Sequence, residues 1–523
     1  MDYLWVAIAF LSGFLVKQIN LPPLIGYLAA GFGLHAMGVT PEESLYTLAD
    51  LGVVLLLFTI GLKLNVGSLF KPEIWVSATG HMGLIILLTT VNCLFLGYLG
   101  LQYFVGLDWP AAALIGLAVS FSSTVCAIKI LEEKGELKAR HGQAAIGILV
   151  IQDIAAVVFV TLATDKSPSL WALGLFALPL IRPLLNGLLE RSGHGEVLPL
   201  AGFFLALLGG ELFESLGLKA ELGALVFGVL ISGHSKASEL SKSLLNFKDL
   251  FLIGFFLTIG FTALPTVDML GVALIMAIAL PVKSLFFFLF QTSLKLRSRT
   301  AFLSSLALTN YSEFGLIVCA ASVGHGLLPK EWLVIMALAV SLSFIFSSVV
   351  NTKSHHFYTR WGSRLKRVER LQRLPEDQFS QPSGTVLVVG MGRVGSGAYD
   401  SLCNDLGKDV CGADVDRNLV SAQNEAGRKV IVADTEDPDF WAHIDLQQLD
   451  LVVLALPKYQ DIIETTYQLK QVNYQGKITA IAHYEDEEKA LQSAGIDVVF
   501  NFYANAGAGL AERSVHLFKP DLS

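Results

Sequence analysis

The chain has 523 residues, of which 53% are hydrophobic and 16% are charged, and its mean hydropathy is +0.58. Soluble globular proteins carry about 25% charged residues, so this composition excludes a single soluble enzyme, a secreted disulfide scaffold and a disordered chain. The formal net charge of −8 gives no reason to expect a nucleic-acid partner.

The charged residues are distributed unevenly along the chain. Residues 1–352 contain 40 of them, about 11%, whereas residues 353–523 contain 42, about 25%. We therefore expect a membrane domain over 1–352 and a soluble domain over 384–523. The segment between them, 353–383, begins with a run of Lys and Arg and predicts a basic helix and a polar linker at the membrane surface.

The first part of the chain contains a series of apolar segments, each close to the roughly 20 residues that a helix needs to cross a bilayer. We predict thirteen spans: 4–18, 22–38, 47–62, 74–98, 110–130, 142–163, 169–189, 197–216, 219–233, 244–263, 268–292, 299–323 and 331–352.

The basic residues between these spans predict the orientation. If the N-terminus is outside, the cytoplasmic connections and helix ends carry 15 Lys and Arg, and the external ones carry 3. Cytoplasmic loops are enriched in Lys and Arg, so this bias supports both the orientation and the count. An odd number of spans then places the soluble domain in the cytoplasm.

The span that contains GILVIQDIAAVVFV has a carboxylate in its middle. A charge at mid-bilayer is costly, so Asp153 is a functional candidate by default, and a structural ion pair across helices is the alternative. We expect Asp153 to bind a proton or a monovalent cation in turn. Gln152 beside it can add a neutral carbonyl ligand for K⁺ or Na⁺.

The preceding span contains hydroxyl side chains at membrane depth. Ser122, Ser123 and Thr124 follow Ser120 in GLAVSFSSTVCAIKI. They either bond back to their own helix or mark a place where the helix unwinds and offers oxygen atoms to an ion.

Two later spans are also interrupted by polar residues. Pro281 opens the backbone of ALPVKSLFF near Lys283, which either reaches the membrane interface or is a mobile partner of Asp153. In the second reading, removing Lys283 should move the pH of half-maximal activity upward. Four polar residues interrupt ALTNYSEFGLIV, namely Thr309, Asn310, Ser312 and Glu313. Glu313 is either a second titrating site or a structural hydrogen-bonding residue.

The interruptions fall at matching positions if spans 1–6 and 8–13 form inverted repeats. Span 5 then corresponds to span 12, and the carboxylate of span 6 lies beside two broken helices that cross. This arrangement is typical of a cation:proton exchanger rather than an enzyme. The sequence has no TVGYG-like segment of the kind that forms a potassium-channel filter.

The soluble domain begins with GTVLVVGMGRVGSG. The apolar run 385–389 precedes Gly390, Gly392 and Gly395, and Arg393 and Val394 begin the helix that follows. In this pattern the glycines allow a tight turn, a close approach of phosphate and helix–strand packing. Asp414 follows 22 residues after Gly392, where an acidic side chain binds the ribose hydroxyls.

The alternation of strands and helices continues to the end of the chain. Apolar runs at 429–434, 449–456, 477–483 and 496–501 predict further strands of a Rossmann-type α/β domain, and Asp434 ends the third strand. About 20 residues after the last strand cannot form a substrate domain. We therefore expect a nucleotide that regulates rather than a redox cofactor, or else a Rossmann fold retained only for dimerisation.

Nearly the whole chain resembles the KefC-type potassium:proton antiporters of bacteria. The similar segments are, in order, LPPLIGYLAAGFGLHAMG, LADLGVVLLLFTIGLKL, SSTVCAIKILEEKGELKARHGQAAIGILVIQDIAAVV, FKDLFLIGFFLTIG and the Rossmann domain, which is similar to KTN (regulator of K⁺ conductance) domains.

The resemblance implies that Asp153 carries the ion, with Gln152 beside it and Ser122, Ser123 and Thr124 at the helix break. It implies a homodimer in the bacterial inner membrane and AMP, ATP or NAD(H) as the regulatory ligand. Some members are held shut by glutathione. Here Lys63 stands where the family often has Glu, SKSLLN replaces an acidic loop, and the longer C-terminal extension is missing; these departures weigh against glutathione gating but leave it open as an alternative.

The sequence leaves two alternatives open. A sodium:proton antiporter would use the same mechanism, because coordination number and cavity size cannot be read from a sequence. A nucleotide-gated potassium channel or a membrane-tethered sensor would share the Rossmann domain but would not couple cation movement to proton movement.

Overall fold

The structure is a computed structural model. It describes residues 3–18, 23–63, 71–162, 169–218, 220–261, 264–370, 372–374, 377–406 and 409–518. Some residues of the predicted segments lie outside this description: 22, 163, 219, 262 and 263 of the spans, 371, 375 and 376 of the linker, and 407, 408 and 519–523 of the soluble domain. The chain forms two compact units, one of residues 1–134 and 141–372 and one of residues 135–140 and 373–523.

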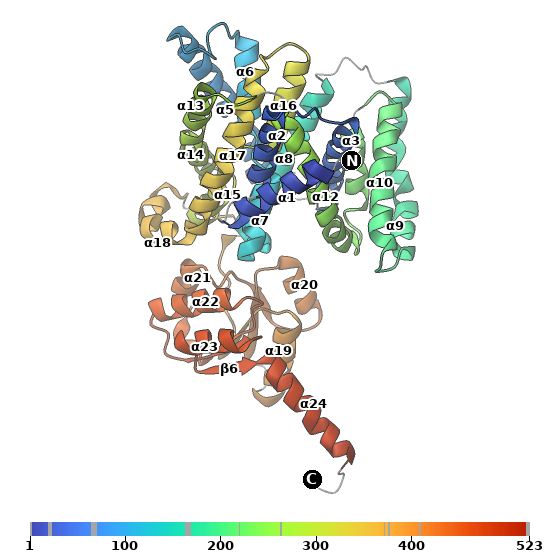
Figure 1. The fold of residues 1–523 in the computed structure, drawn as a ribbon. Helices are drawn as coiled ribbons and strands as arrows, with labels where there is room; N and C mark the ends of the chain where they lie inside the picture. The colour runs from blue at the N-terminus through green and yellow to red at the C-terminus, as the bar shows by residue number, and fades with distance from the viewer. Residues whose placement is uncertain are drawn as a thin grey trace. The chain divides into compact units, whose positions relative to one another are not determined.

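Within the described residues, the first unit is built from helices and their connections (Figure 1). Its helices are α1 (Tyr3–Gln18), α2 (Pro23–Ala36), α3 (Glu43–Lys63), α5 (Pro72–Tyr98), α6 (Trp109–Ser120), α7 (Thr124–Lys134), α8 (Arg140–Leu162), the 3₁₀ helix Leu170–Ile181, α9 (Arg182–Arg191), α10 (Val197–Ser215), α11 (Ala220–Ile231), α12 (Ala237–Gly260), α13 (Val267–Ile278), α14 (Leu280–Ser293), α15 (Ser298–Ala307), α16 (Glu313–Gly324), α17 (Glu331–Thr352) and α18 (Ser354–Leu365).

Each of the thirteen predicted spans coincides with one helix or with two consecutive helices. Among the described residues, five helices are long and apolar enough to cross a membrane: Glu43–Leu62, Pro72–Tyr98, Val197–Ser215, Val267–Ser293 and Glu331–Thr352. The spans at 110–130 and 299–323 each divide into two shorter helices, α6 and α7 and then α15 and α16, because a few residues between them are not helical.

Close packing in this unit depends on small residues, as in other membrane bundles. A Cβ atom on Gly61 of α3 would collide with the backbone of Leu225 and Gly228 on α11. A Cβ atom on Gly315 of α16 would likewise collide with the backbone carbonyl of Ala118 on α6. These two helices therefore cross with their backbones in contact. The main apolar core surrounds this crossing and includes side chains of α6, α13, α16 and α17.

The second unit contains a parallel sheet of six strands in the order β3-β2-β1-β4-β5-β6 (Figure 1). The strands are β1 (Val386–Val389), β2 (Val410–Asp414), β3 (Val430–Val432), β4 (Leu451–Leu454), β5 (Lys477–Ala482) and β6 (Val498–Asn501). The helices are α19 (Arg393–Leu406), α20 (Arg417–Glu425), α21 (Pro438–His443), α22 (Tyr459–Gln471), α23 (Glu485–Ser493) and α24 (Phe502–Phe518).

The strand order confirms the Rossmann-type fold. Apolar strand residues such as Leu387 and Val388 are buried in separate clusters on the two sides of the sheet, which is the pattern of a parallel sheet covered on both faces. The order reverses between β1 and β4. In open α/β sheets, ligands bind in the crevice at the carboxyl ends of the strands where the order reverses.

Candidate functional site

The first candidate site of the membrane unit begins at the break between α6 and α7. The backbone leaves the helix after Ser120, and Phe121 is extended, with φ −70° and ψ 147°. The freed N–H of Ser122 donates to Gln152 Oε1 (2.9 Å), and the N–H of Ser123 donates to Asn310 Oδ1 (2.6 Å). Side chains from distant parts of the chain therefore satisfy two backbone donors that the break in the helix leaves free.

The second break separates α15 from α16. Asn310 donates through Nδ2 to the carbonyl of Ala307 (2.9 Å), and Ser312 caps α16 by accepting from the N–H of Phe314 (3.1 Å). The hydroxyl of Ser122 donates to the carbonyl of Leu308 (2.8 Å). This bond and the bond from Ser123 to Asn310 join the two breaks directly.

Lys283 of α14 stabilises both breaks from one side. Its buried Nζ donates to the carbonyls of Val119 (3.0 Å), Phe121 (2.6 Å) and Asn310 (2.8 Å), and it lies 5.2 Å from the centre of the Tyr311 ring. These are carbonyls at the C-terminal ends of two broken helices, where a cation is favourable. An ammonium group has three N–H donors, so none remains for Asp153.

Asp153 of α8 lies next to the first break. Its side chain is buried, and Oδ2 accepts a hydrogen bond from the Thr124 hydroxyl (2.9 Å). The carboxyl of Glu313 is near enough to act on it electrostatically. Gln152 points its amide toward the break, where Nε2 donates to the carbonyl of Ser120 (3.2 Å). The site thus combines one carboxylate with hydroxyl and amide oxygens, a ligand set suited to a hard cation.

The structure brings all seven sequence-predicted residues of this site to one crossing: Ser122, Ser123, Thr124, Gln152, Asp153, Lys283 and Glu313. It does not show the direct pair of Lys283 with Asp153. Sequence reasoning noticed Asn310 only as an interruption and missed that it links the two breaks. The signal in the sequence was an Asn side chain inside an apolar span, because a buried amide needs hydrogen-bond partners from elsewhere in the chain.

The glycine turn of the second unit lies at the point where the strand order reverses. Gly390 has φ +87°, a conformation that glycine adopts without strain, and a Cβ atom on Gly395 would collide with the carbonyl of Gly390. A Cβ atom on Gly392 would meet nothing within 4 Å. Gly392 therefore leaves open space at the start of α19, where backbone N–H groups and the helix dipole favour a phosphate.

Asp414 supports this turn from the end of β2. Its Oδ2 accepts from the N–H of Met391 (2.8 Å), and its Oδ1 accepts from the N–H of Asp416 (2.9 Å). Each carboxylate oxygen has a second lone pair, so Asp414 can still accept from ribose hydroxyls. It also holds the loop in place, a role that the sequence did not indicate.

A cavity of about 570 Å³ opens beside the turn. Predicted residues that line it are Gly390, Gly392, Arg393, Val394, Asp414 and Asp434, whereas Gly395 packs behind them. Residues that the sequence did not indicate include Thr435, Glu436, Lys458, Asp461 and His483 from the ends of other strands and the start of α22, and Glu136 and Lys138 from the segment 135–140.

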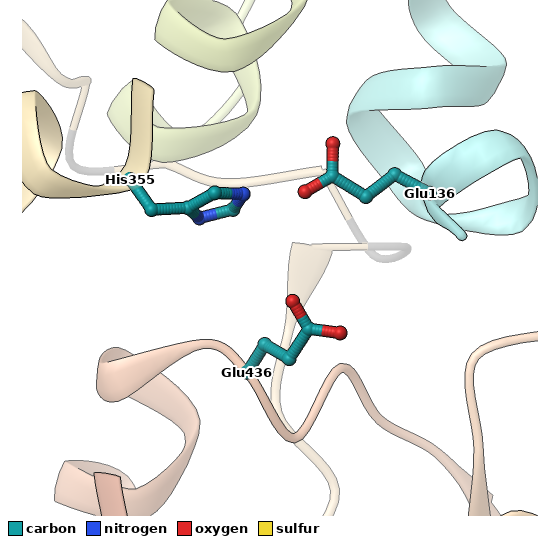
Figure 2. Close-up of side chains that lie close together, drawn as sticks. All are labelled: Glu136, His355 and Glu436. Atoms are coloured by element: carbon teal, nitrogen blue, oxygen red, sulfur yellow. The ribbon is translucent and has the colours of Figure 1, made fainter. Parts of the chain in front are cut away.

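The cavity is bordered by several acidic side chains. Figure 2 shows the carboxylates of Glu136 and Glu436 directed toward the same space, and their oxygen atoms lie within 4.8 Å of one another. His355, also labelled there, belongs to α18 of the first unit. Lys138 balances part of this charge by donating to Asp416 Oδ2 (2.7 Å).

Two parts of the chain match known protein families. Residues 6–352 match the family of transmembrane sodium/hydrogen exchangers. The chain belongs to this family. It is therefore a cation:proton exchanger, a transporter and not an enzyme. Residues 386–502 of the exchanger match the TrkA-N domain, which is a nucleotide-binding Rossmann domain.

A curated relative is similar to this chain over most of its length. The exchanger is 27% identical over 506 residues to the glutathione-regulated potassium-efflux system protein KefC of Salmonella schwarzengrund, covering 92% of this chain and 78% of the relative. This confirms the resemblance to KefC-type antiporters with a C-terminal KTN domain.

Two solved structures are each similar to one part of the chain. The sodium proton antiporter MjNhaP1 of Methanocaldococcus jannaschii is 13% identical, with a TM-score of 0.47 and coverage of 70% of this chain and 96% of that one. The TrkA-N domain of the inner membrane protein ybaL of Escherichia coli is 23% identical, with a TM-score of 0.23 and coverage of 25% and 96%.

Proposed function

We propose that the protein is a potassium:proton antiporter in which Asp153 binds a proton and K⁺ alternately. The observation that carries this proposal is the buried Asp153 carboxylate beside two joined helix breaks, held by the Thr124 hydroxyl at 2.9 Å. The KefC relative is a potassium-efflux system protein, and this supports K⁺ as the cation.

The exchange follows from charge balance at one carboxylate. When Asp153 is ionised, its charge and the Gln152 carbonyl can replace part of the hydration shell of K⁺. When Asp153 takes a proton, it loses the charge that attracts the cation, so the two ions compete for the same place. Alternating access then requires that the site at Asp153 be open to only one side of the membrane at a time.

The orientation rests on the distribution of basic residues. We infer that the protein spans the inner membrane of a bacterium, with its N-terminus outside and the second unit in the cytoplasm, because 15 Lys and Arg then lie at cytoplasmic positions and 3 at external ones. We also infer a homodimer, as the KefC resemblance implies. Cross-linking in native membranes tests the dimer, and protease protection tests the orientation.

Two alternatives differ from this proposal in what they transport. A sodium:proton antiporter would use the same residues, and a nucleotide-gated channel would conduct cations without proton coupling. Purified protein in liposomes with a pH-sensitive dye distinguishes them when K⁺, Na⁺ or Rb⁺ is added in turn. We expect proton movement coupled to K⁺, and cation flux with no proton movement would contradict exchange.

The TrkA-N cavity supports a regulatory role for an adenine nucleotide: AMP, ATP or NAD(H). A ligand changes transport only if it binds two conformations with different affinity. The cavity includes Glu136 and Lys138, and the segment 135–140 connects α7 to α8 along the chain. Nucleotide that orders this segment would therefore act on the two helices that carry Thr124 and Asp153. The basic stretch 353–373 and the segment 234–249, most of which belongs to α12, are further routes by which nucleotide binding could influence transport.

Glutathione gating is not part of the proposal, although the KefC relative is named for it. Glutathione gating is left out because Lys63 and the SKSLLN segment differ from the residues at these positions in glutathione-gated members. Adding glutathione to the liposome assay checks this, and inhibition of exchange by glutathione would overturn it.

We expect Gly392→Asp to weaken nucleotide binding by about tenfold or more and to remove the effect of nucleotide on the exchange rate, with cation preference unchanged. The new carboxylate enters open space without a steric clash, so it acts by repelling phosphate. Gly397→Asp is the matched control, because Gly397 also faces open space on α19 but does not line the cavity. Calorimetry on the full-length protein measures the affinity, and equal affinities in the two variants would contradict the site.

Binding of NADH should weaken as the pH rises through about 6. Burial raises the pKa of the Asp461 carboxyl to about 6, and the Glu136 and Asp434 carboxylates add to the rise against the opposing charge of Lys458. Below this pH Asp461 is neutral and repels the pyrophosphate less. Asp461→Asn should therefore flatten the pH dependence and raise the affinity at pH 7.5 on the order of tenfold.

NADH is the suitable probe, because its pyrophosphate does not titrate in this range as a terminal phosphate does. Asp405→Asn removes an exposed carboxylate that does not line the cavity and serves as the control. If the wild type and Asp461→Asn show the same pH dependence, Asp461 does not face the bound nucleotide.

A further inference from the structure

A group of buried polar side chains lies between α5 and α14, outside the exchange site. Ser77 and His81 of α5 and Gln291 of α14 are all fully buried. Within the part of the chain that the structure describes, the Ser77 hydroxyl and both amide atoms of Gln291 have no hydrogen-bond partner, and the His81 ring has no polar partner beyond its contact with the Lys283 backbone. Buried polar atoms are almost always bonded to protein or to water, so three such atoms on two adjacent helices, with a histidine ring between them, require an explanation.

These side chains lie along one line that ends at Lys283. The His81 ring stacks on Phe287, with the ring centres 3.4 Å apart and an angle of 11° between the planes, and it lies beside Lys283. Ser77 is four residues before His81, and Gln291 is four residues after Phe287, so each lies one turn away on the same face of its helix. Lys283 in turn donates to carbonyls of both helix breaks.

We propose that Ser77, His81 and Gln291 line a narrow hydrated passage through which protons reach the crossing at Lys283, and that His81 relays them. A neutral imidazole accepts a proton from water on one nitrogen and releases a proton from the other, so the ring returns to its neutral form with its N–H on the opposite side. The inference rests on the proposed exchange function, because a proton route matters only to a protein that moves protons.

The surroundings of His81 favour a relay over permanent protonation. The charged group that faces it is the ammonium of Lys283 on α14, which repels a second positive charge. Helix α6, which also packs against α5, contains no titratable residue between Trp109 and Ser120. Helix α8 contacts α5 through Gly147 and Ile74, and on α5 itself Glu73 lies two turns away. The Lys283 ammonium beside the ring therefore opposes a lasting positive charge on His81, as a relay requires.

The first test is the pH dependence of K⁺-driven proton movement in liposomes. His81→Phe keeps an aromatic ring against Phe287, and His81→Gln keeps hydrogen-bonding groups, but neither can relay a proton. We expect both variants to exchange about tenfold more slowly above neutral pH, where protons are scarce, and to approach the wild-type rate in acid, with an unchanged apparent affinity for K⁺. A wild-type pH profile in His81→Phe would overturn the proposal.

The second test does not depend on transport. Radiolysis of water labels side chains that touch bound water, and mass spectrometry locates the label. Phe287 and Phe58 are equally buried, but only Phe287 borders the proposed passage, so we expect oxidation at His81 and Phe287 and not at Phe58. Equal protection of both phenylalanines would overturn the passage. If the wild type shows no exchange, the proposed function fails, and the labelling alone decides whether the passage contains water.

Discussion

Asp153→Asn is expected to reduce cation-driven proton movement to the rate of protein-free liposomes while leaving the protein folded. The substitution removes both the proton-binding group and the only negative charge that the α8 region offers to a cation at this break. It adds no burial cost, because an amide of the same shape replaces a fully buried carboxylate. The hydrogen bond from Thr124 can be kept, since the amide oxygen also accepts.

The measurement is a liposome assay of the purified variant, with thermal unfolding followed in parallel. Asp268→Asn is the control, because it removes an exposed carboxylate at the start of α13. We expect that variant to exchange at the wild-type rate. Substantial K⁺-driven proton movement by Asp153→Asn would remove this residue from the mechanism and turn attention to Glu313.

The sequence was sufficient to predict the parts of the fold that depend on local composition. Long apolar runs, the hydroxyl cluster after Ser120 and the glycine turn after β1 each produce a local pattern, and the helices, the helix breaks and the parallel sheet follow from those patterns. Even the meeting of the two breaks was predictable in outline, because interrupted helices occupied matching positions in the two proposed repeats.

Specific partners were less predictable, because they depend on side-chain direction across distant elements. Lys283 was considered as a partner of Asp153, since both are ionisable residues in apolar spans, whereas its N–H groups point to the carbonyls of Val119, Phe121 and Asn310. A broken helix exposes carbonyls that no sequence pattern marks as acceptors. His81 escaped notice for a similar reason, because a single histidine in an apolar span carries no pattern.

The hydrogen bonds of Lys283 lead to the second large expected effect. Lys283→Met should abolish exchange and lower the free energy of unfolding by about 3 kcal/mol, because three buried carbonyls lose their donors at once. Met has a similar length and fills the space without a charge. The loss should appear at every pH, since only the hydrogen bonds of Ser122 and Ser123 would then join the two breaks.

The loss of both exchange and stability expected for Lys283→Met differs from what Lys283 would cause if it acted only through its charge on Asp153. If Lys283 acted mainly by repelling protons from that carboxylate, its removal would leave stability unchanged and move the pH of half-maximal exchange upward. Measuring exchange from pH 6 to 9 together with thermal unfolding separates the two, with Lys330→Met as the control for an exposed lysine in the same unit. A stable, active Lys283→Met variant with a shifted pH profile would show that the carbonyl contacts are dispensable and that Lys283 works through Asp153.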